Sequence, residues 1–154
     1  MSKLQRVGWR EMIGLPDFVS MRIPAKIDTG ARTSSLHATD IERFTRDGHN
    51  WLRFALDIGD GASEPVVCEL PRADRRVVTS SNGEAQERFF VKTTLVIGDI
   101  RFRAEFSLAD RSDMKFPVLV GRMALRSRFL VDSGRSYLQS PPEERRRLLG
   151  EKTA

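Results

Sequence analysis

The sequence is poor in the residues and runs that mark secreted and membrane proteins. Among its 154 residues Cys68 is the only cysteine, which excludes a disulfide within the chain and any zinc cluster built from several cysteines. The first fifteen residues mix charged side chains with isolated apolar ones, unlike a signal peptide, and no apolar run reaches membrane-spanning length. We therefore expect a cytoplasmic protein in a reducing compartment, with no membrane partner.

Motifs for metal and nucleotide chemistry are missing as well. No His-Glu-x-x-His motif occurs, and the two histidines, His37 and His49, lie twelve positions apart, a spacing that fits no common zinc site. No glycine-rich phosphate loop is present. We predict that the protein uses no metal and no cofactor, with His37 a structural histidine and Cys68 a small buried apolar residue. A zinc-dependent hydrolase, in which His37 and another ligand converge on a metal, is the third of three hypotheses.

The composition is typical of one charged globular domain. Hydrophobic residues make up 40% of the chain and charged residues 31%, and the length fits a single domain. The net charge is +5 and arginine far outnumbers lysine, which favours partners that carry carboxylates or phosphates. A solvated basic surface explains the same charge equally well. We expect one domain at residues 1–140 and a basic tail at 141–154 that forms a helical turn or stays mobile.

Alternating apolar and polar residues predict a fold made almost entirely of strands. The alternation is clearest at residues 52–58 and 100–108, where apolar side chains occupy every second position. A further strand at 88–97 is joined to the second of these by Gly98-Asp99, a dipeptide suited to a tight hairpin. Many short strands with Gly and Asn turns indicate an all-β sandwich or barrel. The shorter predicted strands are residues 7–14, 21–27, 66–70, 75–79, 118–120 and 129–131, and the one predicted helix is 122–128.

Residues 80–83, Ser-Ser-Asn-Gly, have the sequence of a hairpin tip. They lie between Val77-Val78 and Phe89-Phe90, so the hairpin is predicted to be long. In most β proteins such a hairpin is only a connection, whereas in a protease it can be a flap that closes over the substrate.

The sequence Asp28-Thr29-Gly30-Ala31 follows an extended apolar run and is the main candidate for a catalytic site. Aspartic proteases present their carboxylate in such a turn, and they need two carboxylates that share a proton. One acts as base toward water while the other, protonated, polarises the scissile carbonyl. Gly30 lets a partner loop approach closely, and the Thr29 hydroxyl can hydrogen-bond to an equivalent loop.

The Asp-Thr-Gly motif occurs once, so the second carboxylate has to come from elsewhere. A second copy of the chain can supply another Asp28, and a monomer would need a substitute such as Asp57, Asp74 or Asp110. Asp132-Ser133-Gly134 is similar in sequence, but too few residues follow it to complete a second lobe. We interpret it as a loop at the end of a strand.

A second element lies 93 residues after Asp28, where the apolar segment 116–120 ends in Gly121-Arg122 before the predicted helix. With this pairing the chain resembles the retropepsin-like aspartic proteases, in which the two segments cross beneath the catalytic loop. The resemblance implies a closed, acid-protease β-barrel with one short C-terminal helix, a homodimer, and a structural ion pair made by Arg122. Gly121 and Arg122 are therefore expected to support the catalytic turn.

A closer resemblance extends over nearly the whole chain. The chain is similar to the RimB family, retropepsin-like proteins also labelled putative ATP-dependent zinc proteases. Members of that family are associated with an ATP-grasp ligase that adds glutamates to a ribosomal protein of the small subunit. The resemblance implies an endopeptidase acting on such poly-glutamate tails, with that ribosomal protein as a partner. The matching segments are 8–11 (Gly-Trp-Arg-Glu), 27–38, 74–79, 119–122 and 128–132.

Three arginines are candidate ligands for an acidic substrate. Arg32 follows the catalytic turn directly, and Arg75 and Arg76 lie at the base of the predicted flap hairpin. A cationic cleft would bind poly-glutamate, although solvated arginines at strand edges explain the same positions. Arg32 also departs from the retropepsin pattern, which has Asp at this position and uses it as the ion-pair partner of Arg122.

The competing hypothesis is a non-catalytic basic β-barrel that binds ribosomal RNA or a ribosomal protein. Its support is the sequence pI near 10.0 and two aromatic residues, Trp51 and Phe90, which would stack on bases if exposed. No recognised nucleic-acid motif accompanies them. A buried Asp28 far from any second carboxylate would favour this hypothesis.

Overall fold

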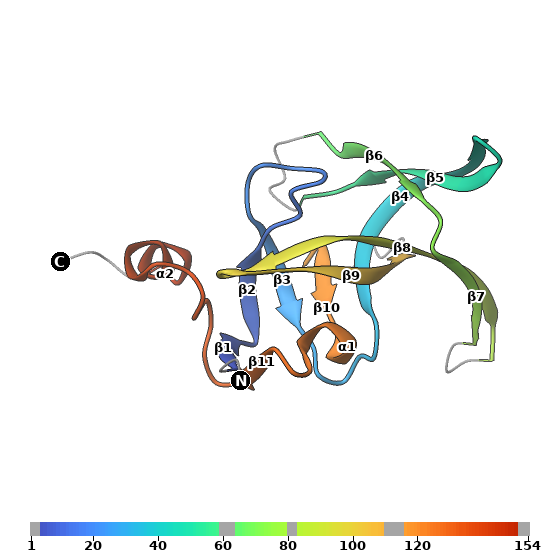
Figure 1. Ribbon diagram of the computed structural model, residues 1–154. Helices are drawn as coiled ribbons and strands as arrows, with labels where there is room; N and C mark the ends of the chain where they lie inside the picture. Colours follow the sequence, from blue (N-terminus) through green and yellow to red (C-terminus); the bar gives the residue numbers. More distant parts are fainter. Residues whose placement is uncertain (1–3, 59–63, 80–82, 110–115, 151–154) are drawn as a thin grey trace.

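The computed structural model describes residues 4–58, 64–79, 83–109 and 116–150, and most of them lie in strands (Figure 1). The all-β prediction is confirmed at this level. The elements in chain order are β1 (Gln5–Gly8), β2 (Arg10–Ile13), β3 (Ile23–Ile27), β4 (Ser34–Arg46), β5 (His49–Leu56), β6 (Val66–Pro71), β7 (Asp74–Thr79), β8 (Ala85–Ile97), β9 (Ile100–Ala109), β10 (Val118–Val120), α1 (Arg122–Leu125), β11 (Phe129–Asp132) and α2 (Pro142–Leu148).

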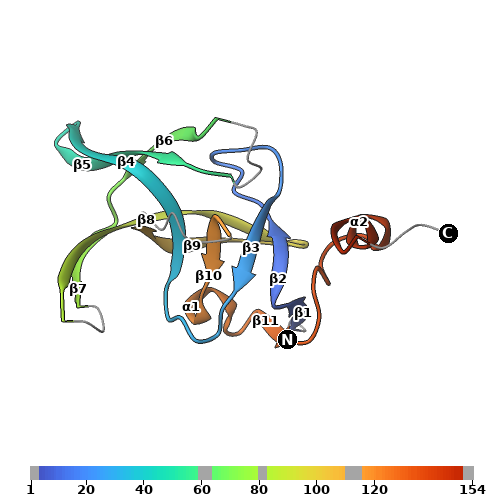
Figure 2. The same ribbon diagram turned by 180° about the vertical axis from the view of Figure 1, so that it is seen from behind.

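Most strands belong to one strongly curved sheet. Its order is β2-β3-β10-β4-β9-β8-β7, and β5 and β6 continue from the far half of β4 as an antiparallel ribbon. Figures 1 and 2 show β4 running the full height of the molecule, from the loop after β3 to this ribbon. The strands β1 and β11 form a separate parallel pair.

The predicted closed barrel is wrong, because no sheet closes among the described residues. The two ends of the curved sheet approach each other only at an isolated bridge between Gly14 and Val96. The chain leaves the strand path directly afterwards, at Leu15 and Pro16, and proline has no N–H with which to extend a ladder.

The described residues contain two short helices, the one predicted and one in the tail, where a helical turn or a mobile segment was expected. The predicted helix at 122–128 is confirmed but shorter, as α1, and a second helix, α2, forms in the predicted basic tail. Pro142 begins α2, Glu143 and Glu144 occupy its first turn, and the residues at 145–147 are arginines. This distribution of charge complements the helix dipole. Neither helix in the described part of the chain has the length or apolar composition needed to span a bilayer.

The strand predictions that rest on clear alternation are confirmed. The β8–β9 hairpin turns at Gly98, which has φ +58. Residues 7–14, predicted as one strand, form β1 and β2 in two different sheets, separated at Trp9. The arms of the predicted long hairpin pair from Asp74↔Phe90 to Thr79↔Ala85, and its tip at 80–82 lies outside the described residues.

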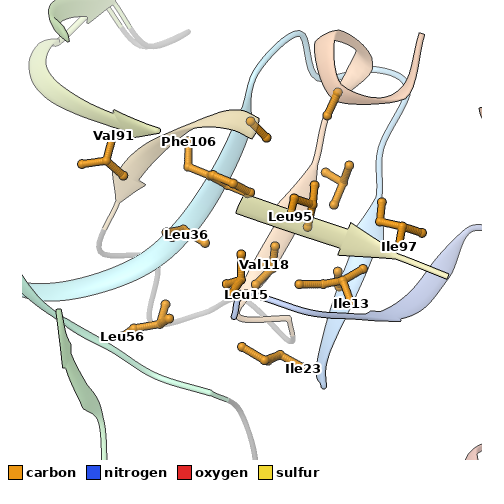
Figure 3. Close-up of a cluster of buried hydrophobic side chains, with 14 of the residues drawn as sticks. Ile13, Leu15, Ile23, Leu36, Leu56, Val91, Leu95, Ile97, Phe106 and Val118 are labelled. Carbon is orange, nitrogen blue, oxygen red and sulfur yellow. The ribbon is translucent and has the colours of Figure 1, made fainter. Parts of the chain in front are cut away.

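The hydrophobic core lies inside the curve of the sheet (Figure 3). It is built from the inward faces of strands far apart in sequence, so it fixes β3 and β10 beside each other. This pairing matters because β3 leads into Asp28 and β10 leads into Gly121. The labelled core residues are Ile13, Leu15, Ile23, Leu36, Leu56, Val91, Leu95, Ile97, Phe106 and Val118.

The segment Gly8-Trp9-Arg10-Glu11 fastens the C-terminal region to the start of the chain. The Glu11 carboxylate is completely buried and accepts hydrogen bonds from three backbone N–H groups, those of Gly8 (2.7 Å), Leu138 (2.9 Å) and Gln139 (3.0 Å). The Arg10 guanidinium lies over two aromatic rings, 4.7 Å from the centroid of Trp9 and 4.9 Å from that of Tyr137.

The same segment also supports the strand that carries the candidate catalytic turn. The carbonyl of Trp9 accepts a hydrogen bond of 2.8 Å from the N–H of Ile27, the residue before Asp28. The fold therefore ties both chain ends to the region of the site.

Candidate active site

Asp28 begins a tight turn where β3 ends. Its backbone N–H donates to the carbonyl of Val120 (2.8 Å), which continues the parallel pairing of β3 with β10 by one residue. Its Oδ1 accepts a hydrogen bond from the N–H of Gly30 (2.9 Å), and its carbonyl accepts one from Ala31 (3.3 Å). This bond orients the carboxylate of the half-buried Asp28, and its Oδ2 accepts no hydrogen bond from the part of the chain that the structure describes.

Gly121 crosses directly beneath this turn. A Cβ at position 121 would lie 2.8 Å from the carbonyl oxygens of Ala31 and Thr33, so only glycine fits without a shift of the backbone. The N–H of Gly121 donates to Oγ of the buried Ser34 (3.0 Å). The loop that follows Asp28 and the start of α1 are therefore held together by close backbone contacts and by this hydrogen bond.

Arg122 extends this connection through its backbone and its side chain. Its N–H donates to the carbonyl of Ala31 (2.8 Å), and its Nη1 donates to the carbonyls of Thr29 (3.0 Å) and Gly30 (3.1 Å). The retropepsin pattern would place an acidic partner at position 32, where this chain has arginine. Here two carbonyls of the turn itself take the guanidinium instead.

Thr29 and two apolar side chains form an exposed surface beside the turn. The hydroxyl of Thr29 has no hydrogen-bond partner among residues 4–58, 64–79, 83–109 and 116–150, and Met123 and Leu130 are 45% and 55% exposed. A cavity of about 720 Å³ between them is lined also by Arg122 and Leu125.

The three arginines predicted to bind substrate lie in different surroundings. Arg32 is exposed and makes no ion pair with any residue that the structure describes. Arg75 is 3.6 Å from Glu87, across the hairpin. Arg76 is the most constrained, because it binds Asp74 (2.7 Å) and Glu105 (2.9 Å) and lies 4.0 Å from the centroid of the Phe90 ring.

Two of these arginines, Arg32 and Arg76, share a cavity of about 860 Å³, which we call the basic cleft. It lies between the catalytic loop, the base of the β7–β8 hairpin, the first half of β9 and α1. Arg75 is not part of its wall. Sequence reasoning missed three further cations that line it, Lys92, Arg103 and Arg128. Lys92 and Arg103 come from the paired strands β8 and β9, whereas Arg128 lies between α1 and β11, so only the folded structure shows that all three line one cavity.

The other aspartates that the sequence offered as partners of Asp28 lie on or next to other strands. Asp74 accepts hydrogen bonds from the N–H of Arg75 and from the side chain of Arg76, and these lower its pKa. Asp57 follows β5, and Asp110 lies outside the described residues. Asp132 ends β11 and binds Arg6 (2.8 Å), as expected of a loop at a strand end.

The residues considered for zinc are spread over three strands. His37 lies in β4, His49 begins β5, and Cys68 is buried in β6, where burial raises the pKa of the thiol to about 12. In the part of the chain that the structure describes, no three His, Cys, Asp or Glu residues form a group that could hold a metal ion.

The aromatic residues considered for base stacking are less accessible than the RNA-binding hypothesis requires. Phe90 is buried, with 4% of its surface exposed, beneath the guanidinium of Arg76. Trp51 is half-buried against Phe44, and the guanidinium of Arg46 covers its ring at 4.4 Å.

Comparison with known proteins shows the family to which the chain belongs. The model of the family described as "Retropepsin-like aspartic endopeptidase RimB" matches residues 6–142. Two similar curated proteins are each named "Probable alpha-L-glutamate ligase". The one from Shewanella pealeana is 34% identical over 151 residues, which is 96% of this chain and 33% of the relative. The one from Desulfotalea psychrophila is 33% identical over 127 residues, which is 82% of this chain and 27% of the relative. The chain thus spans about a third or less of these relatives.

A solved structure has the same fold. It is the crystal structure of a protein of unknown function from Legionella pneumophila, which superposes with a TM-score of 0.77 at 24% identity. The match covers 90% of this chain and all of the other chain.

Proposed function

Because the chain belongs to the RimB-like family of retropepsin-like aspartic endopeptidases, we propose that it hydrolyses acidic peptides with Asp28 as its catalytic carboxylate. The observation that carries this proposal is the turn itself. Asp28 follows a strand of the core, one of its oxygens is held by Gly30, and Gly121 and Arg122 brace the loop from beneath. This rigid support is what an aspartic dyad requires of each half.

The reaction needs a second carboxylate, and we propose that a second copy of the chain supplies it. Two Asp28 residues close together share one proton and titrate as a pair. The ionised carboxylate removes a proton from water, which attacks the scissile carbonyl, while the protonated one donates to the carbonyl oxygen. Collapse of the tetrahedral intermediate breaks the C–N bond, and the amine leaves with a proton. The exposed Thr29, Met123 and Leu130 give each copy a surface beside the turn for this contact.

We propose poly-glutamate tails as the substrate, including those of a small-subunit ribosomal protein. The support is twofold. The relatives named glutamate ligases are about three times as long as the matched region. A segment similar to this chain is therefore part of a longer protein that is named for joining glutamate. The basic cleft, which residues 32–34 of the loop after Asp28 help to line, has five cationic side chains and one acidic one among its described lining residues.

The test is incubation of a glutamate-extended peptide with the wild type, with Asp28→Asn, and with Asp47→Asn as a matched control. Asp47 lies in the exposed turn between β4 and β5 at φ 51, a conformation that asparagine also adopts. We expect cleavage by the wild type and the control, no effect of a chelator, and no cleavage by Asp28→Asn with the fold intact. Normal cleavage by Asp28→Asn refutes the mechanism, and inhibition by the chelator favours the zinc hydrolase. Tight RNA binding without any cleavage favours the basic binding module.

A further inference from the structure

The basic cleft contains more positive charge than the carboxylates of residues 4–58, 64–79, 83–109 and 116–150 neutralise. Arg76 is held by Asp74 and Glu105, and Arg103 lies 3.6 Å from Asp17 and donates to the carbonyl of Lys92 (3.2 Å). Among the described residues that line the cleft, Glu105 is the one carboxylate, and it forms an ion pair with Arg76. These two arginines form a paired, structural side of the cleft.

The remaining three cations are Arg32, Lys92 and Arg128, and none makes an ion pair with a described carboxylate. Lys92 is exposed and lies directly opposite Glu105 in the β8–β9 ladder, yet Glu105 binds Arg76 and not Lys92. Arg128 is held over the Phe102 ring at 4.2 Å, and its Nη1 lies 3.5 Å from the carbonyl of Ala124. The guanidinium of Arg128 is thus positioned by an aromatic ring and a carbonyl, neither of which carries a negative charge.

These three cations come from three separate parts of the chain and line one cavity together with residues 32–34, which follow the Asp28 turn. Arg32 is four residues after Asp28, Lys92 is on β8, and Arg128 follows α1. Converging like charges repel one another, so an anionic ligand is stabilised there at the expense of a neutral one. The first half of β9 has β8 on one side and the cleft on the other, because β4 pairs with β9 only from Phe106 onward.

We propose that the basic cleft is the substrate subsite that selects glutamate side chains, with Lys92 and Arg128 as specificity-determining residues alongside Arg32. This proposal rests on the proposed peptidase function. It adds the residues that bind the glutamate side chains of the substrate. Carboxylate groups next to a negatively charged dyad would be repelled, and these cations offset that repulsion. Arg76 and Arg103 shape the wall of the cleft and do not contact the substrate carboxylates.

The test measures binding separately from cleavage. A fluorescein-labelled hexaglutamate is titrated into Asp28→Asn, which binds without turnover, and into the same protein carrying Lys92→Gln or Lys92→Glu. Arg53→Gln is the matched control, because Arg53 is an exposed cation on β5 outside the cleft. Cleavage of the unlabelled peptide is then measured with the single variants that retain Asp28.

We expect Lys92→Gln to raise the dissociation constant about fivefold, near the upper end for one exposed ion pair. Lys92→Glu should raise it more than about tenfold, because repulsion replaces attraction. Arg128→Lys, which keeps the charge, should bind more tightly than Arg128→Gln. Arg53→Gln should stay within about twofold of the parent protein.

The outcomes separate this proposal from the peptidase itself. If the wild type cleaves hexaglutamate and Lys92→Gln cleaves and binds as well as Arg53→Gln, the subsite is refuted and the peptidase stands. If binding depends on Lys92 but the wild type cleaves nothing, the subsite stands and the peptidase is refuted. Failure of hexaglutamate to bind, or Lys92-dependent binding of a single-stranded oligonucleotide in preference to it, overturns the subsite.

Discussion

Glu11 offers a direct test of how the two ends of the chain are held together. Its carboxylate is fully buried and accepts three backbone hydrogen bonds, one from Gly8 and two from the segment at 138–139. Hydrogen bonds to a charged acceptor contribute about 1.5–3 kcal/mol each. Glu11→Ala removes both acceptor oxygens and leaves three N–H donors without this partner, so the loss should be about 4.5 kcal/mol if each bond contributes the low end of that range. This is a large share of the roughly 5–15 kcal/mol that stabilises a domain of this size.

Glu11→Gln should cost much less, for a geometric reason. Oε2 accepts from Gly8 and Leu138, whereas Oε1 accepts from Gln139 alone. A glutamine can keep its oxygen at the Oε2 position and lose only the third bond, at a cost of about 1.5–3 kcal/mol. The expected order of stability is therefore wild type, then Gln, then Ala.

Urea unfolding followed by tryptophan fluorescence measures these differences, and amide hydrogen exchange at Leu138 and Gln139 localises them. Glu42→Ala, an exposed glutamate on β4, is the control and should stay within about 0.5 kcal/mol of the wild type. If Glu11→Gln and Glu11→Ala are equally stable, or if exchange at Leu138 does not increase, the three-bond account of Glu11 is wrong.

Two further predictions concern buried positions near and far from the site. Gly121→Ala should lower the free energy of unfolding by about 1–3 kcal/mol, because the new Cβ would lie 2.8 Å from backbone atoms of Ala31 and Thr33, which would have to shift. Its peptide cleavage should fall by more than the lost folded fraction explains, and unchanged cleavage would show that the crossing does not position Asp28. Cys68, with its pKa raised to about 12 by burial, should not react with a thiol-specific disulfide reagent at about pH 8 until urea unfolds the protein. Reaction of the folded protein at the rate of a free thiol would contradict the buried position.

Strand prediction succeeded where one face of a strand is buried and failed where the chain bends. The alternation at residues 100–108 predicted β9 closely. The long strand β4 was missed, because its register shifts between Thr39 and Glu42 and Asp40 has φ 52. A bulge moves the side chains after it to the opposite face, so the period of two is lost in the sequence although the strand continues.

The backbone of the candidate site was easier to predict than its charges. The sequence indicated that Asp28 and Gly121 belong together, and the structure places them on paired strands. It did not indicate which arginines are already neutralised. Arg76 and Glu105 are 29 positions apart and meet only through the register of three strands, which alternation alone does not determine.

Position 32 connects the support of the turn with the proposed selection of substrate. An acidic residue there would attract Arg122, as the retropepsin pattern implies, and would also place a negative charge at the mouth of the basic cleft. With Arg32 in its place, Arg122 binds the carbonyls of Thr29 and Gly30, so the turn keeps its support without an ion pair. Because that support uses backbone acceptors, the side chain at position 32 is released from a structural role. Its charge then adds to those of Lys92 and Arg128, so one departure from the retropepsin pattern both accompanies the altered support and contributes to the cationic character of the cleft.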